Sequence, residues 1–326
     1  LNGGTISGGT LDQQGGAALS VQSSSSNRLV GVQVLGDLNL TAANAALRVG
    51  GNLNVSGTVR MGALNCSLGF EGSQTFQSGT ISCESPPGGS FGGMIEMQSP
   101  GTLTIAPGAT IRGGRGTIGG SWQFGQPMTL VNNGTIASDV SGALLTIAGP
   151  SFTNAGQVQA INGGTLTRSG GPYVQTAGDT LVGNVLNAST GVQLNGGTLR
   201  GNAGTISGNV VNNGGVLAPG STAAGALNIV GTYTQGASGV MNVEIGGTTQ
   251  GAQFDRLTVS GAATLGGTLN IQLINGFQPT SGSFAILGHA SRTGTFATVN
   301  GTSIGNGFSF APDYITSSTQ TTLVVQ

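Results

Sequence analysis

The sequence predicts an all-β protein, a right-handed parallel β-helix (β-solenoid) of about 19–20 residues per coil with an aromatic-rich C-terminal β cap. Three observations predict it: a glycine-rich composition, a short repeated unit and strand-like alternation. The chain of 326 residues has 63 Gly and only 19 charged residues, 9 basic and 10 acidic. Hydrophobic residues make up 37% and the mean hydropathy is +0.16, which favours a packed core over disorder.

The repeated unit has the form Gly-x-aliphatic. Seven steps lead from the first marker glycine, Gly79, to the last, Gly215, which gives a mean of about 19 residues per step. A unit of this length cannot bury its apolar face alone, so it must stack on copies of itself. The marker glycines are Gly79, Gly101, Gly116, Gly134, Gly156, Gly178, Gly197 and Gly215.

Short segments between the glycines alternate between apolar and polar residues. Residues 102–111 read TLTIAPGATI and residues 226–235 read ALNIVGTYTQ, and such alternation bounded by Gly, Asn and Pro indicates strands. The corners of a coil need residues that tolerate positive φ, which Gly and Asn do at least cost. Asparagines at equivalent corners are expected to stack into a hydrogen-bonded ladder. The candidates are Asn132, Asn154, Asn195 and Asn213.

The pattern predicts a parallel β-helix over residues 1–276 and a capping region over residues 277–326. Loop excursions are expected near residues 22–28, 84–93 and 119–128. The predicted capping region holds a large share of the aromatic residues of the chain, and an aromatic-rich segment suits a cap over exposed strand edges. The chain begins at Leu1 without a Met or a signal peptide, so we expect a mature or excised fragment.

The chain has two cysteines, Cys66 and Cys83, and their separation in sequence is close to one predicted coil. That spacing would place them on adjacent rungs, within the Cα separation of about 4.4–6.8 Å that a disulfide requires. A disulfide is therefore expected, and it would indicate an oxidising compartment. Two buried free thiols are the alternative.

Residues 119–128, GGSWQFGQPM, contain the only tryptophan of the chain. Trp122 and Phe124 are candidates for stacking on a sugar ring in a surface groove. The alternative is a loop that folds both rings back onto the solenoid.

Charge and composition exclude several functions. With a net charge of −1 and no basic patch, nucleic-acid binding is not expected. No apolar run approaches the roughly 20 residues of a transmembrane segment. No Cys/His cluster suggests zinc, and no cofactor is expected. The ten acids are widely spaced along the chain, so we expect no enzyme. A concave face that gathered two or more acids with an arginine would favour a polysaccharide lyase or hydrolase.

Several units in the second half of the chain carry a family resemblance. They are VVNNGGVLAPG (210–220), GTYTQ (231–235), FDRLTVSG (254–261) and LGGTL (265–269). Their order resembles the C-terminal part of autotransporter passenger domains and related large bacterial surface β-solenoid proteins with adhesin-type repeats. The resemblance implies secretion, a right-handed parallel β-helix and a role in adhesion or surface structure, and it implies no catalytic residue.

The function expected from the sequence is a secreted structural or adhesive β-solenoid on a bacterial surface or in an extracellular fibre. Its expected partners are other copies of itself, or glycans or proteins of a host or environmental surface. An end-to-end filament subunit is the main alternative, because an open rung can stack on another copy. Ice binding is a further alternative. It would need the threonine pairs Thr102 and Thr104, Thr165 and Thr167, and Thr232 and Thr234 on one flat face.

Overall fold

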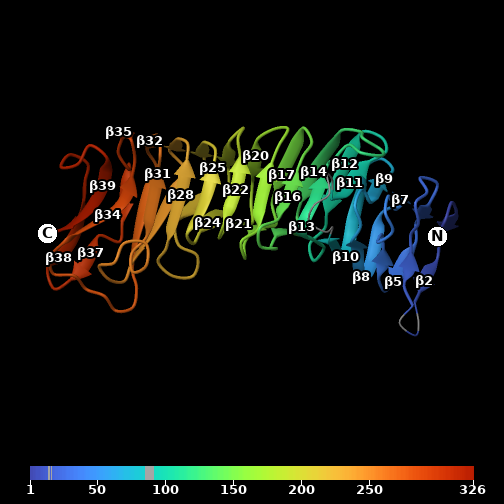
Figure 1. Cartoon of the computed structure of the whole chain (residues 1–326). Coiled ribbons are helices and arrows are strands. Elements are labelled where there is room, and N and C mark those ends of the chain that lie inside the picture. Colours follow the sequence, from blue (N-terminus) through green and yellow to red (C-terminus); the bar gives the residue numbers. More distant parts are fainter. Residues whose placement is uncertain (14, 16, 85–91) are drawn as a thin grey trace. The chain divides into compact units, whose positions relative to one another are not determined.

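The computed structural model describes residues 1–13, 15, 17–84 and 92–326, and all regular structure in them is β-strand and none is helix (Figure 1). The loop expected at residues 84–93 falls largely outside the described residues. The chain forms two compact units, Leu1–Pro172 and Tyr173–Gln326, called unit 1 and unit 2 below. The all-β prediction is therefore confirmed for the described residues.

Unit 1 contains the strands β1 to β19. They are β1 (Thr5–Ser7), β2 (Thr10–Asp12), β3 (Leu19–Ser20), β4 (Arg28–Val30), β5 (Gln33–Leu35), β6 (Leu38–Asn39), β7 (Ala46–Gly50), β8 (Leu53–Met61), β9 (Ser67–Phe70), β10 (Gln74–Glu84), β11 (Gly93–Met97), β12 (Gly101–Ile105), β13 (Thr110–Ile118), β14 (Met128–Asn132), β15 (Thr135–Ser138), β16 (Leu144–Ile147), β17 (Ser151–Asn154), β18 (Gln157–Ala160) and β19 (Thr165–Arg168).

Unit 2 contains the strands β20 to β39. They are β20 (Tyr173–Gln175), β21 (Asp179–Val182), β22 (Val185–Ala188), β23 (Val192–Leu194), β24 (Thr198–Gly201), β25 (Gly204–Ser207), β26 (Val210–Asn212), β27 (Val216–Ala218), β28 (Ala226–Val230), β29 (Tyr233–Gln235), β30 (Val240–Ile245), β31 (Arg256–Val259), β32 (Ala262–Leu265), β33 (Thr268–Leu273), β34 (Ser283–Gly288), β35 (Ser291–Gly294), β36 (Thr298–Asn300), β37 (Ser303–Gly305), β38 (Phe308–Asp313) and β39 (Gln320–Val325).

Each coil of unit 2 consists of three strands. Strand β24 pairs in parallel with β27, β27 with β30, and β30 with β33, so every third strand in the sequence stacks on the one before. The same step of three joins β23 to β26 and β25 to β28. Strands β13 and β15 to β19 follow a comparable parallel pattern in unit 1. Both units are thus parallel β-solenoids.

Coil length varies more than the glycine spacing suggests. The pairing of Val192 with Val210 matches the predicted period. The pairings of Leu103 with Leu130 and of Leu227 with Leu257 span considerably longer coils. The added residues leave the coil as loops, such as residues 119–127 between β13 and β14 and residues 246–255 between β30 and β31. Because these loops lie between strands, the stacking of strands is preserved.

The core is a set of aliphatic columns that run along each unit. In unit 2, Leu199, Leu217, Met241 and Leu269 are consecutive partners in register, and each is fully buried. Inward side chains at the same strand position therefore contact each other from rung to rung. At about 25 cal/mol per Å² of buried apolar surface, these columns supply the main driving force for folding.

In unit 1, one column of inward-facing side chains contains a charged residue, Arg168, which the sequence analysis did not predict. Ile147 pairs with Arg168, whose side chain is only 1% exposed. Its guanidinium donates to the main-chain carbonyls of Gly149 at 2.9 Å and Pro172 at 3.1 Å, and burial lowers its pKa. Carbonyl groups instead of a carboxylate thus solvate this buried cation.

Residues 277–326, expected to form the cap, contain two kinds of structure. Strands β34, β35 and β36 pair in parallel with β31, β32 and β33 and so add one more coil. Strands β37 to β39 are antiparallel, and β39 also pairs with β34. Phe284 packs edge-on against Phe254, Phe277 and Phe310 at centroid distances of 5.3, 6.1 and 5.7 Å. Parallel pairing therefore continues past residue 276, and antiparallel closing strands begin at Ser303.

Asparagine serves the tight turns, but not at the four expected positions. Among described non-glycine residues, positive φ occurs at Asn44, Asn52, Asn65, Asn162, Ala203, Asn275 and Asn306. Asn132 and Asn154 instead end strands β14 and β17 with their side chains buried. None of the asparagines with positive φ is therefore one of the four candidate ladder residues.

Candidate functional site

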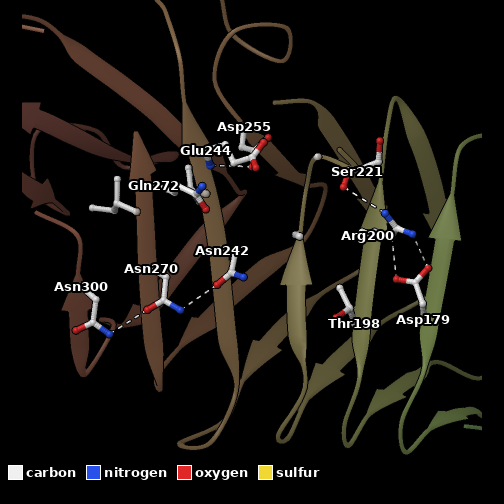
Figure 2. Close-up of a pocket in the computed structure, with 14 residues that line it drawn as sticks. Asp179, Thr198, Arg200, Ser221, Asn242, Glu244, Asp255, Asn270, Gln272 and Asn300 are labelled. Atoms are coloured by element: carbon white, nitrogen blue, oxygen red, sulfur yellow. Dashed lines mark hydrogen bonds and ion pairs between the residues drawn. The ribbon is translucent and has the colours of Figure 1, made fainter. Parts of the chain in front are cut away.

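The candidate site is a shallow groove of about 630 Å³ in unit 2 (Figure 2), called the amide groove below. It is lined by residues of strands β21, β24, β27, β30, β33 and β36 and of the loops that follow β27 and β30. Because strands of neighbouring coils lie about 4.8 Å apart, side chains at one strand position form a column with that repeat. The fold itself therefore sets the spacing of the groups in the groove.

Three asparagines form the central column of the amide groove. Asn242 pairs in register with Asn270, and Asn270 with Asn300. The Asn270 side-chain nitrogen donates to Asn242 Oδ1 at 3.0 Å, and the Asn300 nitrogen donates to Asn270 Oδ1 at 2.9 Å (Figure 2). Each primary amide has two N–H donors and two acceptor sites, so the ladder uses only part of their capacity. The rest is available to a polar ligand.

An ion pair stands at one end of the amide groove. Arg200 donates through Nε and Nη2 to the two carboxylate oxygens of Asp179 at 2.8 and 3.0 Å. Its Nη1 donates to the carbonyl of Ser221 at 3.2 Å. A bidentate pair holds the planar guanidinium in one orientation. The Arg200 guanidinium is therefore held in a fixed orientation, and the carboxylate of Asp179 neutralises its charge.

Asp255 lies beneath the amide groove and is 2% exposed. Its Oδ1 accepts from the main-chain N–H of Gly225 at 2.7 Å, and its Oδ2 accepts from that of Glu244 at 2.9 Å. Burial raises the pKa of Asp255 to about 6, and the neighbouring Glu244 charge acts in the same direction. The carboxylate thus ties the loop before β28 to strand β30.

The amide groove gathers three acids, Asp179, Glu244 and Asp255, with one arginine, Arg200. Such convergence is what an enzyme would need, but two of the acids are engaged. Asp179 is held by Arg200, and both oxygens of Asp255 accept main-chain N–H groups. Glycoside hydrolysis uses two carboxyl groups that flank the scissile bond. Glu244 is the third acid that lines the groove.

Within the part of the chain that the structure describes, no group of three or more His, Cys, Asp or Glu side chains is arranged to hold a metal ion. No helix among the described residues has the length and hydrophobicity that a membrane crossing requires.

The four candidate ladder asparagines form two separate pairs. The Asn132 nitrogen donates to Asn154 Oδ1 at 2.8 Å inside unit 1. The Asn213 nitrogen donates to Asn195 Oδ1 at 2.8 Å on the exposed surface of unit 2. One pair faces the core and the other faces solvent, so they do not belong to a single ladder.

The disulfide expected between Cys66 and Cys83 is not formed, and both thiols are buried. The coil here is longer than the separation of the two cysteines in sequence. Cys83 therefore stacks on Met61 of the preceding coil and not on Cys66. The thiol of Cys66 donates to the carbonyl of Ala63 at 3.2 Å, and burial raises the pKa of Cys83 to about 12. The prediction of a disulfide was therefore wrong.

The two aromatic residues of the loop 119–127 have different environments. Phe124 lies over Gly69, where even a Cβ atom would overlap its ring. Trp122 is 47% exposed and lines a shallow hollow with Gln123, Asn44 and the serines at 23–25. The expected alternative, a ring folded back on the solenoid, thus describes Phe124, and Trp122 remains at the surface.

The threonine pairs proposed for ice binding do not share a face in unit 1. Thr102 and Thr104 lie on β12, which stacks on β14, whereas Thr165 and Thr167 lie on β19, which stacks on β16. These pairs therefore do not form the single flat threonine face that ice binding would need.

Comparison with known proteins adds no further constraint on the site. The chain matches no protein-family model, and the search of curated proteins found no similar sequence.

Sequence reasoning missed the residues of the amide groove, although a signal for them is present. The strands read MNVEI (241–245) and LNIQL (269–273), with an asparagine and a longer polar residue at matching positions. Their separation in sequence exceeds the short period, so a search at the mean glycine spacing passes over the match. An alignment of strand segments regardless of spacing would have found it.

Proposed function

We propose that this chain is a non-catalytic β-solenoid with a structural and adhesive role on a bacterial surface, and that the amide groove binds a neutral polysaccharide. The observation that carries the proposal is the Asn242–Asn270–Asn300 ladder. Its amides repeat along the solenoid axis at the spacing of the coils. A polymer of hydroxyl-bearing units lying along the axis would meet the same donors and acceptors at each rung.

Charge selects the class of ligand. The groove contains Asp179, Glu244 and Asp255 against a single arginine, Arg200. An acidic polysaccharide would be repelled, because the only positive charge lining the groove is already matched by Asp179. Neutral hexose and N-acetylhexosamine polymers bring hydroxyl and amide groups without that cost, so they are the expected ligands.

A surface location is supported by the resemblance of residues 210 to about 299 to autotransporter passenger domains. In this proposal the stack of coils displays the groove at a distance from the cell. An end-to-end filament remains the alternative, and electron microscopy of the purified protein distinguishes it, since discrete short rods contradict a filament.

The binding proposal is tested by retention on insoluble cellulose, chitin and mannan, with polygalacturonate as the acidic comparison. The wild type is expected to bind at least one neutral polymer, and Asn270→Ala to weaken that binding about tenfold because it removes the middle of the ladder. Asn213→Ala is the matched control, since it breaks an exposed asparagine pair of unit 2 outside the groove. No retention on any neutral polymer, or equal retention of the wild type and Asn270→Ala, contradicts the proposal.

A glycoside hydrolase is the second candidate, favoured by the raised pKa of Asp255 beside Glu244. The same incubations distinguish the two functions through the release of reducing ends. We expect none from the wild type. Release that is abolished by Glu244→Gln would replace the binding proposal with the enzyme.

A further inference from the structure

The loop between β13 and β14 is held by a buried charge. Glu96, on β11, is fully buried. Its Oε1 accepts from the main-chain N–H groups of Trp122 and, at 3.1 Å, Gln123. Its Oε2 accepts from those of Gln123 at 3.1 Å and Phe124 at 3.3 Å. Three successive N–H groups thus converge on one carboxylate, a charge-assisted arrangement that fixes the backbone of the loop.

Packing fixes the same loop from a second direction. Glu96 pairs in register with Gly69, and the Phe124 ring occupies the space over that glycine. Gln126 bridges to Met97, which brings the chain back beside β11 before β14 begins. Hydrogen bonds, a packed ring and a backbone bridge therefore all hold the loop against the coil.

The loop leaves one large aromatic side chain at the surface. Trp122 is 47% exposed, although a tryptophan usually buries most of its surface. The hollow beside it, of about 410 Å³, is lined by Ser23, Ser24, Ser25, Asn44 and Gln123. Its lining side chains are uncharged and offer hydroxyl and amide groups. An apolar ring with a neutral hydrogen-bonding rim matches a sugar, which has an apolar face and a rim of hydroxyls.

The geometry points to a second saccharide-binding site in unit 1, with Trp122 as a preorganised stacking platform and the Ser23–Ser25 segment, Asn44 and Gln123 as its polar rim. The ligand class is a neutral hexose or N-acetylhexosamine. Because Glu96 and Phe124 already hold the loop, binding would not have to order it, and this lowers the entropic cost. The site is argued from unit 1 alone and does not depend on the amide groove.

The single tryptophan of the chain allows a direct test. Hexasaccharides of glucose, N-acetylglucosamine and mannose are titrated into the protein while tryptophan fluorescence is recorded. At least one is expected to give a saturable change in intensity and to reduce quenching by iodide. No saturable change with any of the three overturns the proposal.

Variants separate stacking from a change in the fold. By calorimetry in an Asn270→Ala background, which weakens binding at the amide groove, Trp122→Ala is expected to weaken binding at least about tenfold, whereas Trp122→Phe, which keeps a ring, stays within about threefold. Glu96→Gln is expected to increase iodide quenching of Trp122, because an amide nitrogen would then face the loop N–H donors. Asn270→Ala, in the amide groove, is expected to leave the fluorescence titration unchanged. If Trp122→Ala binds as tightly as the wild type, the assignment is wrong. A titration lost in Asn270→Ala would show that the signal comes from the groove.

Discussion

Units 1 and 2 connect their coils at the surface in different ways. In unit 1, ion pairs link neighbouring coils, among them Arg28 with Glu71 and Arg60 with Asp37 and Glu84. Unit 2 has the amide ladder of Asn242, Asn270 and Asn300 and the ion pair of Arg200 with Asp179.

The register of neighbouring strands also differs between these two regions. In unit 1 the pairing of β10 with β8 shifts twice, between Phe76 and Ser78 and again between Ser78 and Thr80. Long arginine side chains tolerate such shifts, because their reach exceeds the distance between rungs. Strands β30 and β33 pair without a shift along their full length, so short asparagine side chains meet. The regular register of β30 and β33 thus permits a ladder of short amides, whereas across the shifted register of β8 and β10 the long side chain of Arg60 reaches Glu84.

Creating a cavity in the core of each unit tests most directly whether units 1 and 2 unfold separately. Leu217→Ala in unit 2 and Ile136→Ala in unit 1 each remove a fully buried aliphatic side chain from a continuous column. Each is expected to lower the free energy of unfolding by about 3 kcal/mol, within the range of about 2–5 kcal/mol for such truncations. Urea denaturation followed by circular dichroism measures it. If the units unfold separately, each variant shifts one transition; a common shift shows that they unfold together.

The second test concerns Asp255, whose folded pKa of about 6 lies above its usual value of 3.8. The folded state then binds this proton more tightly than the unfolded state. Its contribution to stability is fully present below pH 3.8 and is lost as the pH rises through the folded pKa of about 6. The loss is about 3 kcal/mol, from roughly two pKa units at about 1.36 kcal/mol each.

Urea denaturation at pH 4, 5, 6 and 7 checks this, with Asp255→Asn as the reference. Glu71 and Asp313 have lowered pKa values and act with the opposite sign. Only the difference between wild type and variant therefore isolates Asp255. Equal pH dependence in the two proteins would contradict the assignment.

The smallest expected effect tests the comparison of surface links directly. Arg60→Gln in unit 1 removes the arginine that contacts both Asp37 and Glu84, and it is expected to cost less than about 1 kcal/mol. The loss is expected to disappear in about 1 M salt, where charges are screened. Asn213→Ala in unit 2 is expected to have a similarly small effect that does not change with salt. A salt-independent loss for Arg60→Gln would refute the proposed difference.

The stacked strands were predictable from the sequence because glycine spacing and alternation report directly on corners and faces. The disulfide was not, because its prediction assumed a constant coil length, and Cys83 in fact stacks on Met61. The amide groove was hidden for the same reason, since the coils that bring Asn242, Asn270 and Asn300 together are longer than the mean period. The exposure of Trp122 depends on Glu96, which is distant in sequence, and no local pattern reports such a contact.

Variable coil length has a consequence for how such a chain changes over evolution. Residues 246–255 extend one coil, yet β30 still pairs with β33 and β28 with β31. Segments of new sequence can therefore enter between strands and alter the surface without disturbing the neighbouring rungs. A single residue inserted within β24 would instead turn Leu199 outward and Arg200 into the core. Insertions are therefore tolerated in the loops between the strands of this fold and not within the strands themselves.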